Sequence, residues 1–251
     1  MSLKFSVVLA LAALTPLAPA VAADYEPPVY AVDTPEYVPV EVGSGWYLRG
    51  DVGYAFNNAY REDVFGLTPG DTFSRRDLPF SGSVGMGYHF NDFLRAEFNL
   101  GIEPSQKSSL FALGTDGTGD YAISASARNR MYSGMFNLYG DLGTYAGFTP
   151  YIGAGIGLVS TSREYNFSQT YPLVPGANNS LVDSKRRFDY AYTLGAGVSY
   201  NFNQNMAIDL GYQYFSAPNS EYFALTGPAT YALQKGISFH KIKVGLRYDL
   251  W

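Results

Sequence analysis

The sequence predicts an all-β fold, an eight-stranded antiparallel β-barrel that crosses a membrane, and three observations support this. Apolar and polar residues alternate over long segments, the connections between the segments are short and long in turn, and a secretory signal opens the chain. A period of two places alternate side chains on opposite faces of a strand. Because one face is broad and aromatic while the other is small and polar, we expect lipid outside the barrel and a narrow polar interior.

The first part of the chain is expected to lie outside the barrel. Residues 1–23 hold a single lysine as their only charge, then an apolar run and the small residues Ala20–Ala23. This pattern is typical of a secretory signal peptide, and the run is too short to cross a bilayer as a helix. Residues 24–44 carry four prolines, which favours an extended periplasmic leader. The leader is either a spacer or a contact with another envelope component, and the barrel domain is expected over residues 45–251.

Eight alternating segments are expected to form the strands. Each is near or above the about 9–11 residues that a tilted strand needs to cross a bilayer. In chain order they are Gly45–Phe56, Leu78–Phe90, Phe93–Ile102, Arg130–Gly140, Thr149–Ser160, Phe188–Phe202, Met206–Phe215 and Gly236–Trp251. The sixth segment alternates over its whole length. The residues that we expect to face lipid are Tyr190, Tyr192, Leu194, Val198, Tyr200, Phe202, Val244 and Leu246.

The connections between these segments alternate in length. The short ones are Asn91–Asp92, Asp141–Phe148 and Asn203–Asn205, and the long ones are Asn57–Asp77, Glu103–Asn129, Thr161–Arg186 and Ser216–Lys235. Long loops of this size are uncommon inside a compact soluble domain. Short periplasmic turns and long extracellular loops are typical of an outer-membrane barrel. With eight strands both chain ends lie in the periplasm, and the first and last strands must pair to close the barrel.

Charged residues fall on the parity that faces the interior. They are Arg49, Asp51, Arg95, Glu97, Asp209, Lys241, Lys243, Arg247 and Asp249. An eight-stranded barrel is just wide enough for side chains to fill its interior, so opposite charges should pair there. We therefore expect a salt-bridged polar network rather than a conduction path, although sequence alone does not fix which residues pair.

Composition excludes several functions. The chain has no cysteine, which excludes disulfides and cysteine-based metal sites. The formal net charge of −5 and the absence of basic runs argue against a nucleic-acid partner. We expect no cofactor and no bound metal.

One pair of residues invites a catalytic interpretation. Ser238 and His240 place a hydroxyl and an imidazole on one face of a strand. Small barrel enzymes that hydrolyse lipid A use such a pair beside an acid. Their motif places His before Ser, and no acid is assigned nearby here. We therefore predict no catalytic residue and no enzyme activity, with a lipid A hydrolase as the weaker alternative.

The segment Gly45–Tyr54, with the sequence GWYLRGDVGY, makes the chain specific enough to compare with a family. Together with the signal peptide, the leader and the aromatic end, it resembles the small OmpA-like, opacity-type surface barrels of alpha-proteobacteria, a porin-like group. The resemblance implies the outer membrane of a Gram-negative bacterium. It also implies contact with outer-membrane lipid and lipopolysaccharide and assembly by the barrel-assembly machinery. The terminal assembly signal would be Tyr248, Leu250 and Trp251, although Trp251 overshoots the strand parity that Leu250 keeps.

From these observations and the resemblance, we predict that the protein acts as a structural surface component of the cell envelope. Its extracellular loops would be available for adhesion to an extracellular ligand or host surface. A narrow porin-like channel for small solutes remains an alternative, because the glycines of Thr149–Ser160 leave space for water. A soluble eight-stranded binder is a third class, but its apolar residues would have to point inward.

Overall fold

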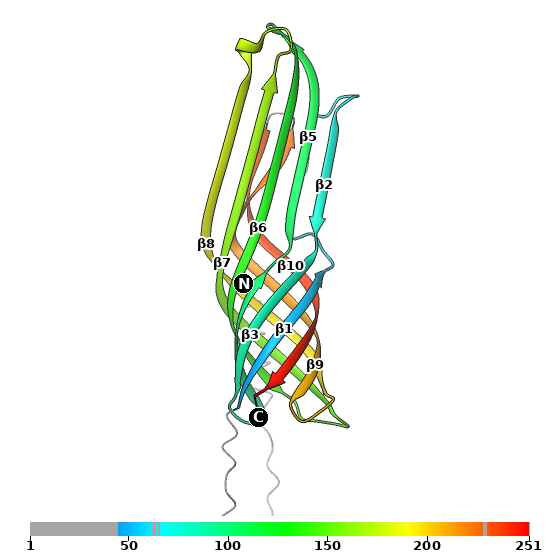
Figure 1. The fold of residues 1–251 in the computed structure, drawn as a ribbon, viewed down its shortest axis with the longest axis vertical. Helices are drawn as coiled ribbons and strands as arrows, with labels where there is room; N and C mark the ends of the chain where they lie inside the picture. Colours follow the sequence, from blue (N-terminus) through cyan, green and yellow to red (C-terminus); the bar gives the residue numbers. More distant parts are fainter. Residues whose placement is uncertain (1–44, 62–63, 65, 228–229, 251) are drawn as a thin grey trace, which may run out of the picture. The chain divides into compact units, whose positions relative to one another are not determined.

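The structure is a single antiparallel sheet of ten strands (Figure 1). It is a computed structural model, and it describes residues 45–61, 64, 66–227 and 230–250. The predicted signal peptide (1–23) and leader (24–44) lie outside the described residues. The strands are β1 (Trp46–Ala55), β2 (Thr72–Leu78), β3 (Phe80–His89), β4 (Leu94–Ile102), β5 (Ser105–Asp116), β6 (Gly119–Asp141), β7 (Phe148–Thr170), β8 (Asn179–Asn201), β9 (Met206–Gly227) and β10 (Thr230–Asp249). Among the described residues, none forms a helix long and apolar enough to cross a membrane.

Eight of these strands pair in a closed ring. The order of neighbours is β6-β4-β3-β1-β10-β9-β8-β7, and β7 pairs back with β6. The predicted pairing of the first and last strands is confirmed, with Val52 of β1 opposite Val244 of β10. The three predicted short connections are also confirmed, because they join β3 to β4, β6 to β7 and β8 to β9.

The prediction of four long loops is wrong. Two segments that were expected to be loops contain β2 and β5. β6 to β10 continue into the long connections that they border, so that they are 20 to 23 residues long. The reason is that these segments also alternate, but between a buried face and an outward face of mixed polarity. In β5, Ser108 and Leu110 are buried, while Lys107, Phe111 and Leu113 are exposed on the outward face. With a mixed outward face the alternation loses its contrast, and the segment resembles a loop.

We call the part of the sheet beyond the ring the extension. It comprises β2, β5 and residues 119–129, 161–170, 179–187, 216–227 and 230–237 of β6, β7, β8, β9 and β10. β8 pairs with β9 only from Tyr192 onward, so β2, β5, β6, β7 and β8 form one layer of the extension and the β9–β10 hairpin another. Apolar residues pack between the two layers, namely Leu110, Ala112, Ile123, Ala125, Ala127, Tyr165, Phe223 and Leu225.

A buried asparagine joins the two layers of the extension. The Asn129 side chain donates a hydrogen bond to the Phe223 carbonyl oxygen at 2.8 Å and accepts one from the Phe223 N–H at 3.0 Å. These two bonds satisfy backbone groups that would otherwise be buried without partners. The extension is therefore an ordered structure with a core of its own.

Candidate functional site

The interior of the ring holds the charged residues that the sequence places on the inward parity. Eight of the nine are buried and Asp249 is half-buried. They come from β1, β4, β9 and β10, and the alternation of each strand turns them inward while apolar neighbours turn outward. The structure therefore brings together residues that lie up to 200 positions apart in the sequence.

Arg49 is the centre of this cluster. Its guanidinium lies 2.8 Å from Asp51, 3.3 Å from Asp209 and 3.6 Å from Glu97, measured between nitrogen and oxygen atoms. The nearest other cations are more distant, with Lys243 at 3.9 Å from Asp51 and Arg247 at 4.0 Å from Asp209. One cation thus bridges three carboxylates from three strands.

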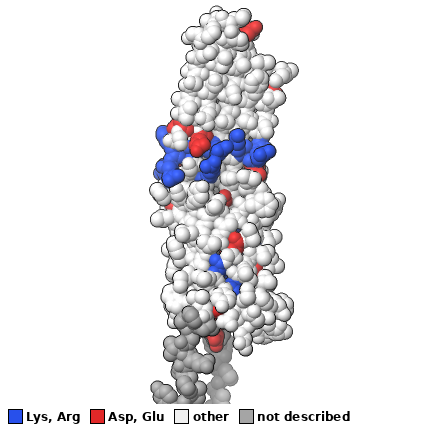
Figure 2. Space-filling view, viewed as in Figure 1, with Lys and Arg blue, Asp and Glu red and all other residues white. Residues whose placement is uncertain are grey.

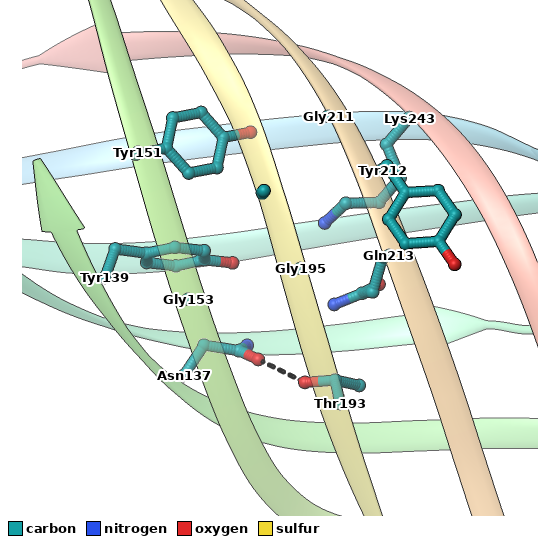
Figure 3. A pocket seen from close by; sticks show the side chains of 11 residues that line it. Asn137, Tyr139, Tyr151, Gly153, Thr193, Gly195, Gly211, Tyr212, Gln213 and Lys243 are labelled. Carbon is teal, nitrogen blue, oxygen red and sulfur yellow. Dashed lines mark hydrogen bonds between the residues drawn. The ribbon is translucent and has the colours of Figure 1, made fainter. Parts of the chain in front are cut away.

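A second cation, Arg95, is held by aromatic rings. Its guanidinium carbon lies 4.8 Å from the ring centre of Tyr139 and 4.9 Å from that of Tyr151, and its Nε lies 3.2 Å from Asp141. In Figure 3, Tyr139 and Tyr151 point toward the same space as Lys243 and Gln213. The cavity between them has a volume of about 10 Å³, which is the space of a single water molecule.

Glycine makes room for these rings. A Cβ at Gly153 would collide with the ring of Tyr139, and a Cβ at Gly197 would stand 2.5 Å from the Tyr151 hydroxyl. In the fifth predicted segment, Gly153 faces Tyr139, Gly155 faces Asn137 and Thr193, and Gly157 faces Met135. Side chains of neighbouring strands therefore fill the space that these glycines leave.

Sequence reasoning missed several members of the cluster. Glu103 lies 2.7 Å from Lys241, and the Tyr47 hydroxyl donates a hydrogen bond to Glu97 at 3.0 Å. Glu103 and Asp141 had been assigned to connections. The alternation of the sequence could have identified Glu103 as an inward residue. Glu103 has the same parity as Arg95 and Glu97 and continues their inward series beyond the expected end of the strand.

The opposite face of the ring is apolar and exposed. Seven of the eight residues expected to face lipid are exposed, and Val198 is half-buried. Of the expected assembly signal, Tyr248 is exposed on β10, Leu250 follows the strand and is half-buried, and Trp251 lies outside the described residues.

The structure gives Ser238 and His240 no catalytic environment. His240 Nδ1 lies 2.5 Å from the Tyr212 hydroxyl, and the imidazole packs against Phe56 and Tyr214. Within the described part of the chain, no carboxylate oxygen lies within 4.0 Å of a ring nitrogen of His240. That part also holds no group of three or more histidine, aspartate and glutamate side chains placed to bind a metal ion.

A separate ion cluster lies in the extension around Glu221. Arg163 and Arg187 contact its carboxylate at 2.7 and 2.8 Å, and Lys235 lies 3.5 Å away. The hydrogen bond from Arg163, with the charge of Arg187, holds the pKa of the Glu221 carboxyl below its ordinary value. The cluster ties β7, β8 and β10 to β9.

Comparison with known proteins agrees with this architecture. The model of the family described as "Outer membrane protein beta-barrel domain" matches residues 6–249. A candidate adhesin of Rickettsia bellii is 29% identical, over 82% of this chain and 88% of its own length. The outer membrane protein PagN of Salmonella typhimurium is 30% identical, over 69% of this chain and 74% of its own length. The N-terminal β-barrel domain of Pseudomonas aeruginosa OprF is 14% identical, with 82% of this chain and 99% of that domain covered and a TM-score of 0.38.

The family match covers most of the chain, including all of the ring and the extension. The chain therefore belongs to the outer membrane protein β-barrel family, and it is a protein of the outer membrane of a Gram-negative bacterium.

Proposed function

We propose that this protein is an eight-stranded transmembrane barrel that anchors the extension outside the cell, where the extension contacts an extracellular ligand or host surface. The observation that carries the proposal is the contrast between ring and extension. The ring exposes an apolar outer face, which fits lipid. The extension exposes mostly polar and charged residues, with scattered apolar ones, and has a separate core, which fits water.

This arrangement supports one orientation of the ring in the membrane, with the extension outside the cell. The three short connections, the start of β1 and the end of β10 lie at the end of the ring away from the extension, which fits a periplasmic side with short turns. Residues 1–23 would be removed as a signal peptide, and residues 24–44 would remain as the periplasmic leader. Tyr248, Leu250 and Trp251 would present the terminal signal to the barrel-assembly machinery.

An apolar tip supports an adhesive role. Leu173, between β7 and β8, is 88% exposed, and Val174 beside it is also exposed. Leu181 and Val182, near the start of β8, are exposed on opposite faces of that strand. Neighbouring apolar residues exposed to water mark contact surfaces for other molecules. The relative in Rickettsia bellii, which is named as a candidate adhesin, also supports an adhesive role.

Adhesion is expected to depend on this tip. Bacteria that display Leu173→Ser with Val174→Ser should bind host cells about fivefold less than wild type, because truncating central contact residues typically costs more than about 1 kcal/mol. Leu67→Ser with Leu233→Ser removes two exposed apolar residues elsewhere and should leave binding unchanged. A second variant would replace residues 167–181 by Asn-Gly, since Asn166 and Val182 already face each other across the hairpin. Equal binding by all variants and wild type would refute the adhesive role.

The filled interior predicts that the protein does not conduct. The interior is crossed by ion pairs from Arg49 and by the rings of Tyr139 and Tyr151, and the cavity at that level has the volume of one water molecule. Planar-bilayer recordings of the refolded chain should therefore show no steady unitary conductance. Tyr139→Gly with Tyr151→Gly, which removes both rings, is the matched variant for detecting a widened interior. Steady, salt-dependent steps from the wild type would favour the porin-like channel.

A further inference from the structure

Lysine and arginine side chains gather in a belt where the ring meets the extension. Figure 2 shows this belt across the face that carries β2, β5, β6, β7 and β8. On β6 the outward side chains change from apolar to cationic within two residues. Tyr132 is an exposed residue of the ring, and Arg130 is the next residue on the same face. Successive residues on one face of a strand are about 7 Å apart. The belt therefore begins about 7 Å from the apolar surface of the ring, measured along the strand.

Four of these cations line one cleft. Arg76, Lys107 and Arg128 are direct neighbours on β2, β5 and β6, and Arg130 follows on the same face of β6. Adjacent strands lie about 4.8 Å apart, so the four positive groups converge. The cleft has a volume of about 280 Å³, and Leu78 and Ser105 complete its lower wall.

These cations form no close ion pair, although Glu164 stands opposite Arg128 across the β6–β7 pair. No carboxylate oxygen of a described residue lies within 4.0 Å of Arg76, Lys107, Arg128 or Arg130. The inward cations behave differently, since Arg163 lies 2.7 Å from Glu221. Four like charges in one cleft repel one another, and an anion bound between them would offset that repulsion.

An apolar groove lies on the outer wall of the ring, where the chain continues from this cleft. β2 leads into β3 and β4 leads into β5, so the cleft residues Leu78 and Ser105 continue into Phe80 and Ile102 on the ring. The outer wall there has an open groove of about 760 Å³, and most of its exposed surface is apolar. The inward-facing residues that also border it are Asp51, Ser81, Ser83 and Ser133. Its outward side chains are Phe80, Val84, Leu100, Ile102 and Tyr132, and Gly82 leaves part of its floor bare.

We propose that the cleft and groove together form a binding site for the lipid A part of lipopolysaccharide. Phosphate groups would accept hydrogen bonds from Arg76, Lys107, Arg128 and Arg130, and one acyl chain would lie in the groove below. Arginine is well suited to phosphate because its planar group donates two parallel hydrogen bonds. The inference rests on the proposed position of the ring in the membrane, because only that position puts the groove in the hydrocarbon of the outer leaflet.

The groove is what favours a lipid over a soluble anion. A sulfated glycan or free phosphate would use the cations, but neither has an apolar part to cover Phe80, Val84 and Leu100. Lipid A carries phosphates and acyl chains in the order in which the wall presents cations and apolar side chains. Exposed apolar surface next to a cationic cleft thus selects an anionic amphiphile.

The test is a lipid titration into the full-length mature protein folded in neutral detergent micelles. Diphosphoryl lipid A should bind the wild type, whereas Arg128→Gln with Arg130→Gln should weaken binding about thirtyfold, since each basic residue near a lipid surface contributes about 1 kcal/mol. Arg76→Gln with Lys107→Gln, on the neighbouring strands β2 and β5, should do the same. The matched control is Lys185→Gln with Arg186→Gln, two exposed cations on β8 outside the cleft, which should change affinity less than about twofold.

Two further arms identify the ligand. Lipid A without phosphates should bind the wild type as weakly as diphosphoryl lipid A binds the cleft variants. Gly82→Phe fills the groove without a clash, because a Cβ there meets nothing closer than 3.9 Å, and it should weaken lipid A binding while leaving the cations intact. Equal losses in the cleft and control variants, no preference for phosphates, or equally tight binding of inorganic phosphate would each overturn the proposal.

Heat-modifiable gel migration separates this inference from the proposed function. A wild-type chain that shows no migration shift and does not insert into lipid would refute the membrane barrel itself. A chain that inserts normally but does not discriminate between phosphorylated and dephosphorylated lipid A would overturn only the lipid site.

Discussion

Leu194→Arg is expected to lower the free energy of unfolding of the barrel by about 2–4 kcal/mol, the cost of a cation near the middle of the bilayer. Leu194 lies midway along the ring part of β8 and is 54% exposed on the outer face. Its neighbours across the sheet, Ala154 and Tyr214, leave its side chain directed outward. An arginine there would face hydrocarbon with no carboxylate beside it. Urea titration of the protein refolded in lipid vesicles measures the loss.

The same strand offers a matched control. Val182 lies on the same face of β8, twelve residues earlier, and is 71% exposed in the extension. Val182→Arg should change stability by less than about 0.5 kcal/mol, because an exposed site in water tolerates the charge. Thr193→Arg tests the opposite face, where the buried Thr193 hydroxyl donates to Asn137 at 3.0 Å, and its penalty should be steric. If Leu194→Arg were as stable as Val182→Arg, the outer face of the ring would not contact lipid.

Strand parity made much of this fold predictable. In the ring, lipid on one side and ion pairs on the other give the two parities very different residues, as Leu194 and Thr193 illustrate. The short turns carry asparagine and aspartate, whose side chains bond nearby backbone; Asn91, for example, accepts hydrogen bonds from the N–H groups of Phe93 and Leu94. Both signals are local, so a single sequence reveals them.

The extension and the ion pairs could not be predicted in the same way. In the extension both faces meet polar groups in places, as at Asn129 and Arg163, so alternation no longer separates strand from loop. The contacts of Arg49 with Glu97 and Asp209 depend on the register of several strand pairs, and a shift of one residue would turn each side chain to the other face. Register is a property of the whole ring, which the sequence of one strand does not contain.

Arg49→Met is expected to destabilise the barrel by about 3–5 kcal/mol, the cost of removing one partner from a buried ion pair. Methionine keeps the length and apolar stem of the side chain, so the change is chiefly in charge. Asp51, Glu97 and Asp209, which are all buried, would lose their shared cation. The remaining cations, Lys243 and Arg247, lie no closer than 3.9 and 4.0 Å to these carboxylates.

The control for this variant is an ion pair in water. Lys235 is 64% exposed and lies 3.5 Å from Glu221, so Lys235→Met should cost at most about 1 kcal/mol. Both variants are compared by urea titration in vesicles of the same lipid. If Arg49→Met cost no more than Lys235→Met, the carboxylates around Arg49 would be solvated. Water would then reach the centre of the ring, and the interior would have to be regarded as an open passage rather than a packed anchor.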